Sequence, residues 1–273
     1  MIKKQHLAFN FYNKKYFSQV FLKDKNIIKK IIFFLNPKKN DLLFEIGPGL
    51  GALTIPLFDF IDHLTVIDID NDVLNFFKNK KIFSKIHFYL MDVLNFNFLK
   101  FYFKNNKKKI RIFGNLPYNI STEFLIHIIK YNFIFKDAHF MFQKEVSNRI
   151  LATHNTKFYG RLSILIQYFF KIKKLFDISQ NSFFPIPKVS STFLKFSPHK
   201  LFPELSFDIN ILSKITKIAF SKRRKILKNS LKKLFTEKDL IFLNIDSSLR
   251  PENLSIKKYY ILTDYFIKKK INY

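Results

Sequence analysis

Glu45-Ile-Gly-Pro-Gly-Leu-Gly51 is the stretch that decides the fold class of this chain. It continues the apolar run Leu42-Leu-Phe44, so a buried strand is expected to pass through a glycine-rich turn into a helix. The chain has only five glycines, whereas average usage of about 7% would give about 19. Three of the five fall in this loop, which indicates a backbone that turns sharply and approaches a ligand closely.

Strand and helix patterns alternate on both sides of this loop. A helix is expected over 24–35, with Asp24 as its N-cap, and Ser121 is expected to cap a later helix. Strands are predicted at 42–46, 64–68, 86–90, 110–113 and 138–142, and further helices at 70–80, 144–153 and 161–169. This alternation predicts an α/β fold with a doubly wound, mainly parallel sheet.

The pattern changes past residue 199. Helical periodicity appears at 209–220, 224–235 and 256–270, with no clear strand, after a proline-containing stretch at 197–203. We therefore expect two domains: an α/β domain over 1–198 and a small, all-helical C-terminal domain over 199–273.

The charge balance is strongly basic. The 48 lysines and arginines and 20 acidic residues give a formal net charge of +28, which is typical of a protein that meets a polyanion. Lysine, asparagine, isoleucine and phenylalanine all have AT-rich codons, so codon drift also inflates the lysine count. The sign of the charge and its clustering still require an explanation.

Other classes of protein are excluded by composition. The chain has no cysteine, which rules out disulfides, a thiol nucleophile and thiolate metal sites, and its seven histidines are scattered. No run of 18 apolar residues and no signal-peptide core are present, so we expect no membrane span, no metal and a cytoplasmic location.

Acidic residues follow the next two strands. Asp68 ends one of them, where a carboxylate can accept hydrogen bonds from ribose hydroxyls, and Asp92 follows the other, where it can accept from an adenine amino group. A nicotinamide dinucleotide and S-adenosylmethionine both fit this arrangement. Dinucleotide loops usually read G-x-G-x-x-G and cradle a pyrophosphate, whereas Gly47 here opens a G-x-G-x-G loop, which favours S-adenosylmethionine.

Asn115-Leu-Pro-Tyr118 ends the fourth predicted strand. The exocyclic nitrogen of adenine is a poor nucleophile, and the Asn115 oxygen with a nearby backbone carbonyl would accept its two N–H hydrogens. Pro117 stiffens the turn, and Tyr118 offers a flat face on which a splayed-out base can stack. A second candidate face is Phe183 or Phe184, next to two prolines.

A basic cluster, Lys222-Arg-Arg-Lys225, opens the predicted helix 224–235. Arg223 and Arg224 are two of only six arginines, the residue that codon drift would erode, and arginine binds phosphate in bidentate fashion. We therefore expect these four side chains to grip an RNA backbone, although a solvated surface helix is the simpler alternative.

With these motifs in order, the chain resembles the ribosomal small-subunit RNA adenine dimethyltransferases, the kasugamycin-susceptibility methylases. The matching segments run nearly end to end: Phe17–Leu22, Glu45–Thr54, Gly114–Thr122, Gln143–Val146, Tyr159–Ser163, Phe183–Val189, Ala219–Lys225, Asn229–Leu231 and Glu252–Ser255. The resemblance implies a Rossmann-like class I methyltransferase sheet and S-adenosylmethionine as donor. It also implies dimethylation of two adjacent adenosines in the 3′-terminal hairpin of 16S rRNA, by a monomer with a role in small-subunit biogenesis.

The resemblance also implies roles for individual residues. Asn115, Pro117, Tyr118 and Phe183 would form the catalytic site for the adenine, and the donor would contact Gln19, Leu22, Gly47, Asp68, Asp92 and Asn115. Two positions depart from the family pattern. Val20 stands where asparagine is usual, so only a backbone contact is possible there, and Asp68 replaces the commoner glutamate.

Three other functions remain open at this point. A 23S rRNA methylase of the antibiotic-resistance type has a similar core, but the extended helical domain and the Phe-x-Pro-x-Pro-Lys-Val segment argue against it. A nicotinamide-dependent dehydrogenase and a basic RNA-binding assembly factor without activity are the others. The intact Asn115–Tyr118 motif argues against the last.

Overall fold

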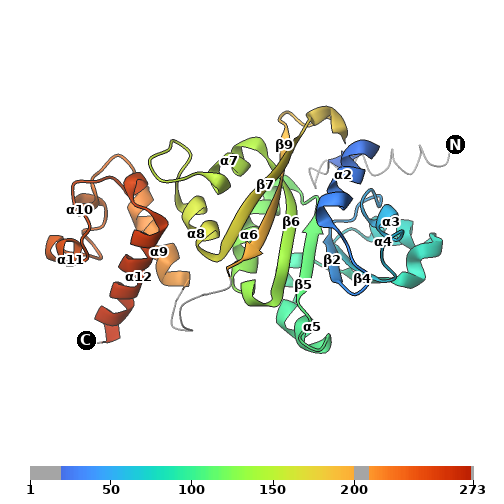
Figure 1. The fold of residues 1–273 in the computed structure, drawn as a ribbon, viewed down its shortest axis with the longest axis horizontal. Coiled ribbons are helices and arrows are strands. Elements are labelled where there is room, and N and C mark those ends of the chain that lie inside the picture. Colours follow the sequence, from blue (N-terminus) through green and yellow to red (C-terminus); the bar gives the residue numbers. More distant parts are fainter. Residues whose placement is uncertain (1–19, 200–208, 272–273) are drawn as a thin grey trace. The chain divides into compact units, whose positions relative to one another are not determined.

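The computed structural model describes residues 20–199 and 209–271, and Figure 1 shows its fold. The chain forms two compact units: Met1–Ser147 with Ile172–Pro198, and Asn148–Lys171 with His199–Tyr273. The expected division at residue 198 had left 148–171 in the first domain. These residues instead join the C-terminal helices, because α8 (Arg161–Phe169) packs against α9 (Ile209–Ser221).

The main sheet has seven strands in the order β4-β3-β2-β5-β6-β9-β7. Their bounds are β2 (Leu42–Ile46), β3 (Leu64–Asp68), β4 (Ile86–Leu90), β5 (Ile110–Gly114), β6 (Phe135–Gln143), β7 (Phe170–Ile178) and β9 (Ser191–Pro198). The pairs from β4 to β6 are parallel, and β9 is antiparallel to β6. The chain winds outward to β4 and then returns to the other side of β2, so the strand order reverses at the β2–β5 pair. Ligands of open α/β sheets bind at such a point, beyond the carboxyl ends of the strands.

Helices flank this sheet (Figure 1). In the first unit they are α2 (Lys25–Leu35), α3 (Thr54–Leu57), α4 (Asn71–Lys78), α5 (Phe98–Lys104), α6 (Tyr118–Ile129) and the start of α7 (Lys144–Leu151). The predicted N-cap of α2 is confirmed, since the Asp24 carboxylate accepts from two backbone N–H groups. The predicted cap at Ser121 is wrong. The helix begins at Tyr118, because Pro117 can precede a first turn without losing a hydrogen bond, and the Ser121 hydroxyl donates to the Tyr118 carbonyl inside that turn.

The second unit contains α8, α9, α10 (Leu227–Ser230), α11 (Glu237–Phe242) and α12 (Ile256–Ile271). The predicted helix over 224–235 is wrong, because only the four residues of α10 are helical there. The backbone N–H of Leu227 donates to the Leu249 carbonyl, and that of Lys228 to the Ser247 carbonyl. The segment is therefore bonded to the 247–249 loop and not to a preceding helical turn.

A two-stranded antiparallel ribbon joins distant parts of the first unit. It consists of β1 (Phe21–Leu22) and β8 (Phe183–Phe184), with Leu22 opposite Phe183. Both of these side chains are buried in one apolar cluster with residues of α2, β2 and β3. Among the described residues, no helix is long and apolar enough to cross a membrane.

Candidate active site

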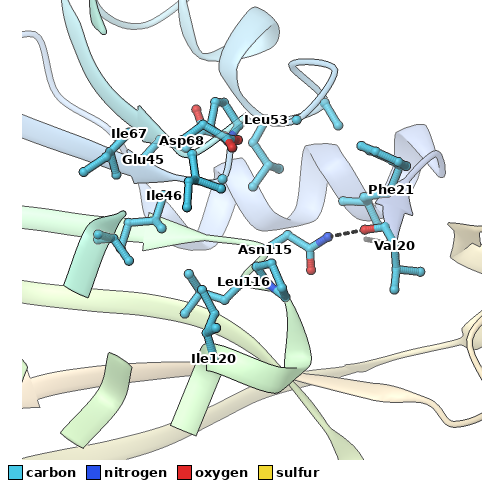
Figure 2. Close-up of a pocket in the computed structure, with 18 of the residues that line it drawn as sticks. Val20, Phe21, Glu45, Ile46, Leu53, Ile67, Asp68, Asn115, Leu116 and Ile120 are labelled. Atoms are coloured by element: carbon cyan, nitrogen blue, oxygen red, sulfur yellow. Dashed lines mark hydrogen bonds between the residues drawn. The ribbon is translucent and has the colours of Figure 1, made fainter. Parts of the chain in front are cut away.

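A cavity of about 280 Å³ opens at the carboxyl ends of β2, β3 and β5, in the first unit (Figure 2). It is a mostly apolar hollow with a few polar groups, as is usual for small-molecule sites. It is lined by Val20, Phe21, Leu22, Glu45, Ile46, Gly47, Pro48, Gly49, Leu50, Ala52, Leu53, Ile67, Asp68, Ile69, Met91, Asp92, Val93, Asn115, Leu116, Pro117, Tyr118 and Ile120. The structure thus brings the predicted donor residues and the Asn115–Tyr118 motif to one cavity.

The glycine loop forms the floor of this cavity with a backbone that only glycine adopts easily. Gly47, Gly49 and Gly51 all have positive φ angles, of 63°, 52° and 77°. A Cβ added at Gly51 would lie 2.9 Å from the Ile55 side chain, so a larger residue there would be both strained and crowded. The loop therefore fits a ligand that lies directly against the main chain.

Asp68 ends β3 at the cavity wall, as predicted, and is 9% exposed. Its Oδ1 accepts a hydrogen bond of 2.9 Å from the backbone N–H of Asp70. Burial raises the pKa of Asp68 to about 6, partly offset by that hydrogen bond. A buried carboxylate with oxygen atoms at the cavity is suited to accept from paired hydroxyl groups.

Asp92 also lines the cavity, just beyond β4. One of its oxygens accepts from the Leu94 backbone N–H at 2.9 Å and caps a short 3₁₀ turn. The capping role that any strand-end acid can play is thus present here, together with a position on the ligand side. Leu22 contributes an apolar contact to the same wall, and Gln19 lies outside the described residues.

Glu45 is a site residue that the sequence analysis did not identify. It lies in β2, lines the cavity and is 2% exposed, and the Thr54 hydroxyl donates to its Oε2 at 2.7 Å. Burial raises the pKa of Glu45 to about 8, and the nearby Asp68 charge acts in the same direction. A glutamate inside an otherwise apolar strand, directly before the glycine loop, was the available signal.

Asn115, Leu116, Pro117 and Tyr118 form the other wall of the cavity. The Asn115 Nδ2 donates to the Val20 carbonyl at 2.7 Å (Figure 2). The Tyr118 hydroxyl lies 2.7 Å from the Ser191 Oγ in β9, which fixes the ring from its far end. Burial raises the pKa of Tyr118, so its hydroxyl stays protonated at neutral pH.

The predicted stacking role of Phe183 requires a correction. Its side chain is 0% exposed and belongs to the apolar core, and it does not line the cavity. The next residue, Phe184, is 43% exposed but also lies outside the cavity lining. Side chains alternate along an extended strand, and the inward position falls on Phe183 because Leu22 faces it across the ribbon.

The predicted RNA-binding cluster lies in the second unit, with all four side chains exposed. Arg223 pairs with Glu252 and also donates to the Lys157 carbonyl at 2.8 Å, so its guanidinium already has protein partners. Lys222, Arg224 and Lys225 stand on the turns that precede α10. Within residues 20–199 and 209–271, no group of three or more acidic or histidine side chains is placed to hold a metal ion.

Comparisons with known proteins give the family. Residues 10–268 match the ribosomal RNA adenine dimethylase family. The chain is 49% identical to the ribosomal RNA small subunit methyltransferase A of Buchnera aphidicola subsp. Schizaphis graminum, over 98% of this chain and 96% of that protein. It is 42% identical to the protein of the same name from Actinobacillus pleuropneumoniae serotype 3, over 94% and 89% of the two chains.

Solved structures show the same fold. The dimethyladenosine transferase of Plasmodium falciparum superposes with a TM-score of 0.77 at 27% identity, over 91% of this chain and 98% of that one. The 23S rRNA methyltransferase ErmE shares the fold with a TM-score of 0.66 at 18% identity, over 90% and 99%. The expected Rossmann-like methyltransferase sheet is thereby confirmed, and the chain belongs to the ribosomal RNA adenine dimethylase family.

Proposed function

We propose that this protein transfers methyl groups from S-adenosylmethionine to the N6 atoms of two adjacent adenosines in the 3′-terminal hairpin of 16S rRNA, during assembly of the small ribosomal subunit. The observation that carries the proposal is that the glycine loop with Asp68 and the Asn115–Tyr118 motif line one cavity. The small-subunit relatives support the choice of substrate, which also implies that the enzyme acts in the cytoplasm.

The residues present fit this donor. Asp68 would accept hydrogen bonds from the ribose hydroxyls, Asp92 would accept from the adenine amino group, and Leu22 would pack on an apolar part of the donor. The glycine loop has no Cβ between its backbone and the cavity, so the methionine part can lie against it. S-adenosylmethionine supplies an electrophilic methyl group on a sulfonium, so the reaction needs no metal ion.

On the other wall, Asn115 and Tyr118 would receive the adenine. The Asn115 Oδ1 and a main-chain carbonyl of the same turn would accept the two N6 hydrogens, which draws the nitrogen towards tetrahedral geometry. The nitrogen lone pair then forms a bond to the methyl carbon while the carbon–sulfur bond breaks, its electron pair stays on sulfur, and an N6 proton leaves to solvent. The monomethylated base keeps one N–H, so a second transfer follows after donor exchange.

The test is incubation of the protein with methyl-labelled donor and unmodified small-subunit particles, followed by mapping of the labelled nucleotides. Label on two adjacent adenosines of the 16S hairpin is the expected result. Label on 23S rRNA in a parallel reaction with large-subunit particles would favour the antibiotic-resistance alternative. RNA binding without any transfer would favour the assembly-factor alternative.

Asn115→Ala is the matched variant for this assay. Loss of one polarising acceptor should reduce single-turnover transfer about 100-fold or more, while donor affinity changes far less. Near-normal transfer by the folded variant would contradict the polarisation mechanism.

A further inference from the structure

The side-chain amide of Asn115 has a fixed orientation. Its Nδ2 donates to the main-chain carbonyl of Val20 at 2.7 Å, across the cavity wall shown in Figure 2. A carbonyl oxygen only accepts hydrogen bonds, so the amide nitrogen must face Val20 and the amide oxygen must face away from it. That oxygen, Oδ1, is the acceptor that the proposed reaction needs.

The Val20 carbonyl is itself held in place by the β1–β8 ribbon. Val20 leads directly into β1, where Leu22 lies opposite Phe183 of β8. Beyond the strand end, the backbone N–H of Lys23 donates to the Ser182 carbonyl at 2.9 Å, so the pairing of the two segments continues. The position of the acceptor for Asn115 therefore depends on a segment some 160 residues further along the chain.

Phe183 anchors this ribbon in the core. Its side chain is 0% exposed and that of Leu22 is 6% exposed, and both pack in the apolar cluster that also contains Ile31 and Leu43. A large apolar side chain at 183 fixes β8 and, through the strand pairing, β1. Its ring has no free face towards the cavity on which a base would stack.

We propose that the β1–β8 ribbon is a positioning device for Asn115, and that Phe183 and Leu22 act as positioning residues through the Val20 carbonyl. The inference rests on the proposed function, because it concerns the orientation of the adenine acceptor. It also accounts for Val20 at a position where asparagine is usual: the contact is made by the main chain, so the side chain at 20 does not matter for it.

Substitutions at Phe183 separate positioning from stacking. Phe183→Leu keeps a large buried apolar group but has no aromatic face, so transfer at saturating donor should stay within about threefold of wild type. Phe183→Val leaves a void beneath the ribbon, and we expect single-turnover transfer to fall about 10- to 100-fold with the melting temperature as a control for folding. A folded Phe183→Leu protein as inactive as Phe183→Val would overturn the proposal in favour of stacking.

A double-mutant cycle tests the route through Asn115. If Phe183 acts by orienting that amide, Phe183→Val should cost no more than about twofold in an Asn115→Ala background. Stacking or a general loss of structure would leave the full effect of Phe183→Val in that background and would overturn the inference. Failure of the proposed function is distinguishable, since it would appear as absence of label on 16S rRNA with the wild-type enzyme.

Val20 provides the matched control. Val20→Ala and Val20→Asn keep the main-chain carbonyl and should transfer methyl groups at near wild-type rates at saturating donor. Asn115→Asp keeps an oxygen acceptor but replaces Nδ2 by a second oxygen facing the Val20 carbonyl. We expect it to lose about as much activity as Asn115→Ala, and an Asp variant near wild type would contradict the orienting role.

Discussion

Two buried carboxyl groups, Glu45 and Asp68, lie at the same cavity and repel each other when ionised. Their burial favours the neutral forms, and the pKa of Glu45 rises to about 8 while that of Asp68 rises to about 6. At neutral pH, Asp68 is therefore mainly ionised and able to accept from hydroxyls, whereas Glu45 keeps its proton in the empty cavity. Entry of a cationic donor would favour ionisation of Glu45, so donor binding should release a proton.

The raised pKa of Glu45 predicts how stability depends on pH. Its folded pKa of about 8 lies above the model value of 4.5, so the folded state holds a proton that the unfolded state loses. The resulting contribution is fully present below about pH 4.5 and is lost as pH rises to about 8. Glu45→Gln keeps an acceptor for the Thr54 hydroxyl but does not titrate. Chemical denaturation should show the difference in unfolding free energy between variant and wild type changing by on the order of 3 kcal/mol between pH 5 and 8. Parallel pH profiles for the two proteins would contradict the assignment.

Asp68 carries the corresponding prediction for donor affinity. Asp68→Ala removes the acceptor for the ribose hydroxyls, at a cost of about 1.5–3 kcal/mol, or about 10- to 100-fold in the dissociation constant. Titration calorimetry on the folded variant measures this, with the exposed Asp62→Ala as a control of equal charge change. The wild-type affinity should also rise from pH 5 to 7, as Asp68 ionises. Unchanged affinity in Asp68→Ala would refute the ribose role.

At the scale of elements, Tyr118 couples the first turn of α6 to β9 through the contact with Ser191. Tyr118→Ala should cost about 1–3 kcal/mol in the transition state through lost stacking on the base. Tyr118→Phe keeps the ring, so transfer should stay near normal, while the unfolding free energy falls by about 1 kcal/mol because the buried Ser191 loses its partner. Kinetics and denaturation of the two variants check this. An inactive but folded Phe variant would indicate a chemical role for the hydroxyl.

Elements with a local signal were predictable. The strands at 42–46, 64–68 and 86–90 match the predicted bounds, because each is a short apolar run followed by a turn or an acidic residue. β7 and β9 were missed, since lysines interrupt the alternation in β7 and prolines dominate the sequence before β9. Residues placed by distant contacts had no such signal.

The candidate site shows the same division. Asp68, Asp92, Asn115 and Tyr118 reach one cavity because the carboxyl ends of parallel strands meet at one edge, and the order of strands and turns is legible in the sequence. The burial of Phe183 and the Val20 contact depend on a ribbon of two-residue strands, too short for any periodicity. The helix expected at 224–235 failed because apolar residues at helical spacing also fit a turn bonded to the 247–249 loop.

At the scale of the whole molecule, a net charge of +28 requires a distinction between cations with protein partners and cations available to RNA. Arg223 is of the first kind, since it pairs with Glu252 and donates to a carbonyl of the same unit. Removing it should therefore disturb the second unit itself. Lys222, Arg224 and Lys225 are exposed on the adjoining turns and are the better candidates for phosphate contacts.

The corresponding prediction is a change in salt dependence. Replacing Lys222, Arg224 and Lys225 together with alanine should leave donor affinity and melting temperature unchanged. If each contacts one phosphate, the slope of log affinity for the RNA against log salt should fall by about 0.7–0.9 per contact, or about 2–3 in all. Arg223→Ala is the contrasting variant, with a lower melting temperature expected from loss of its two partners. The slope is the informative quantity, because counterion release depends on the number of phosphates neutralised, whereas affinity at one salt concentration also reflects damage to the fold. A triple variant with the wild-type slope would mean that these three cations are only surface charge and that the phosphate contacts lie elsewhere on this basic chain.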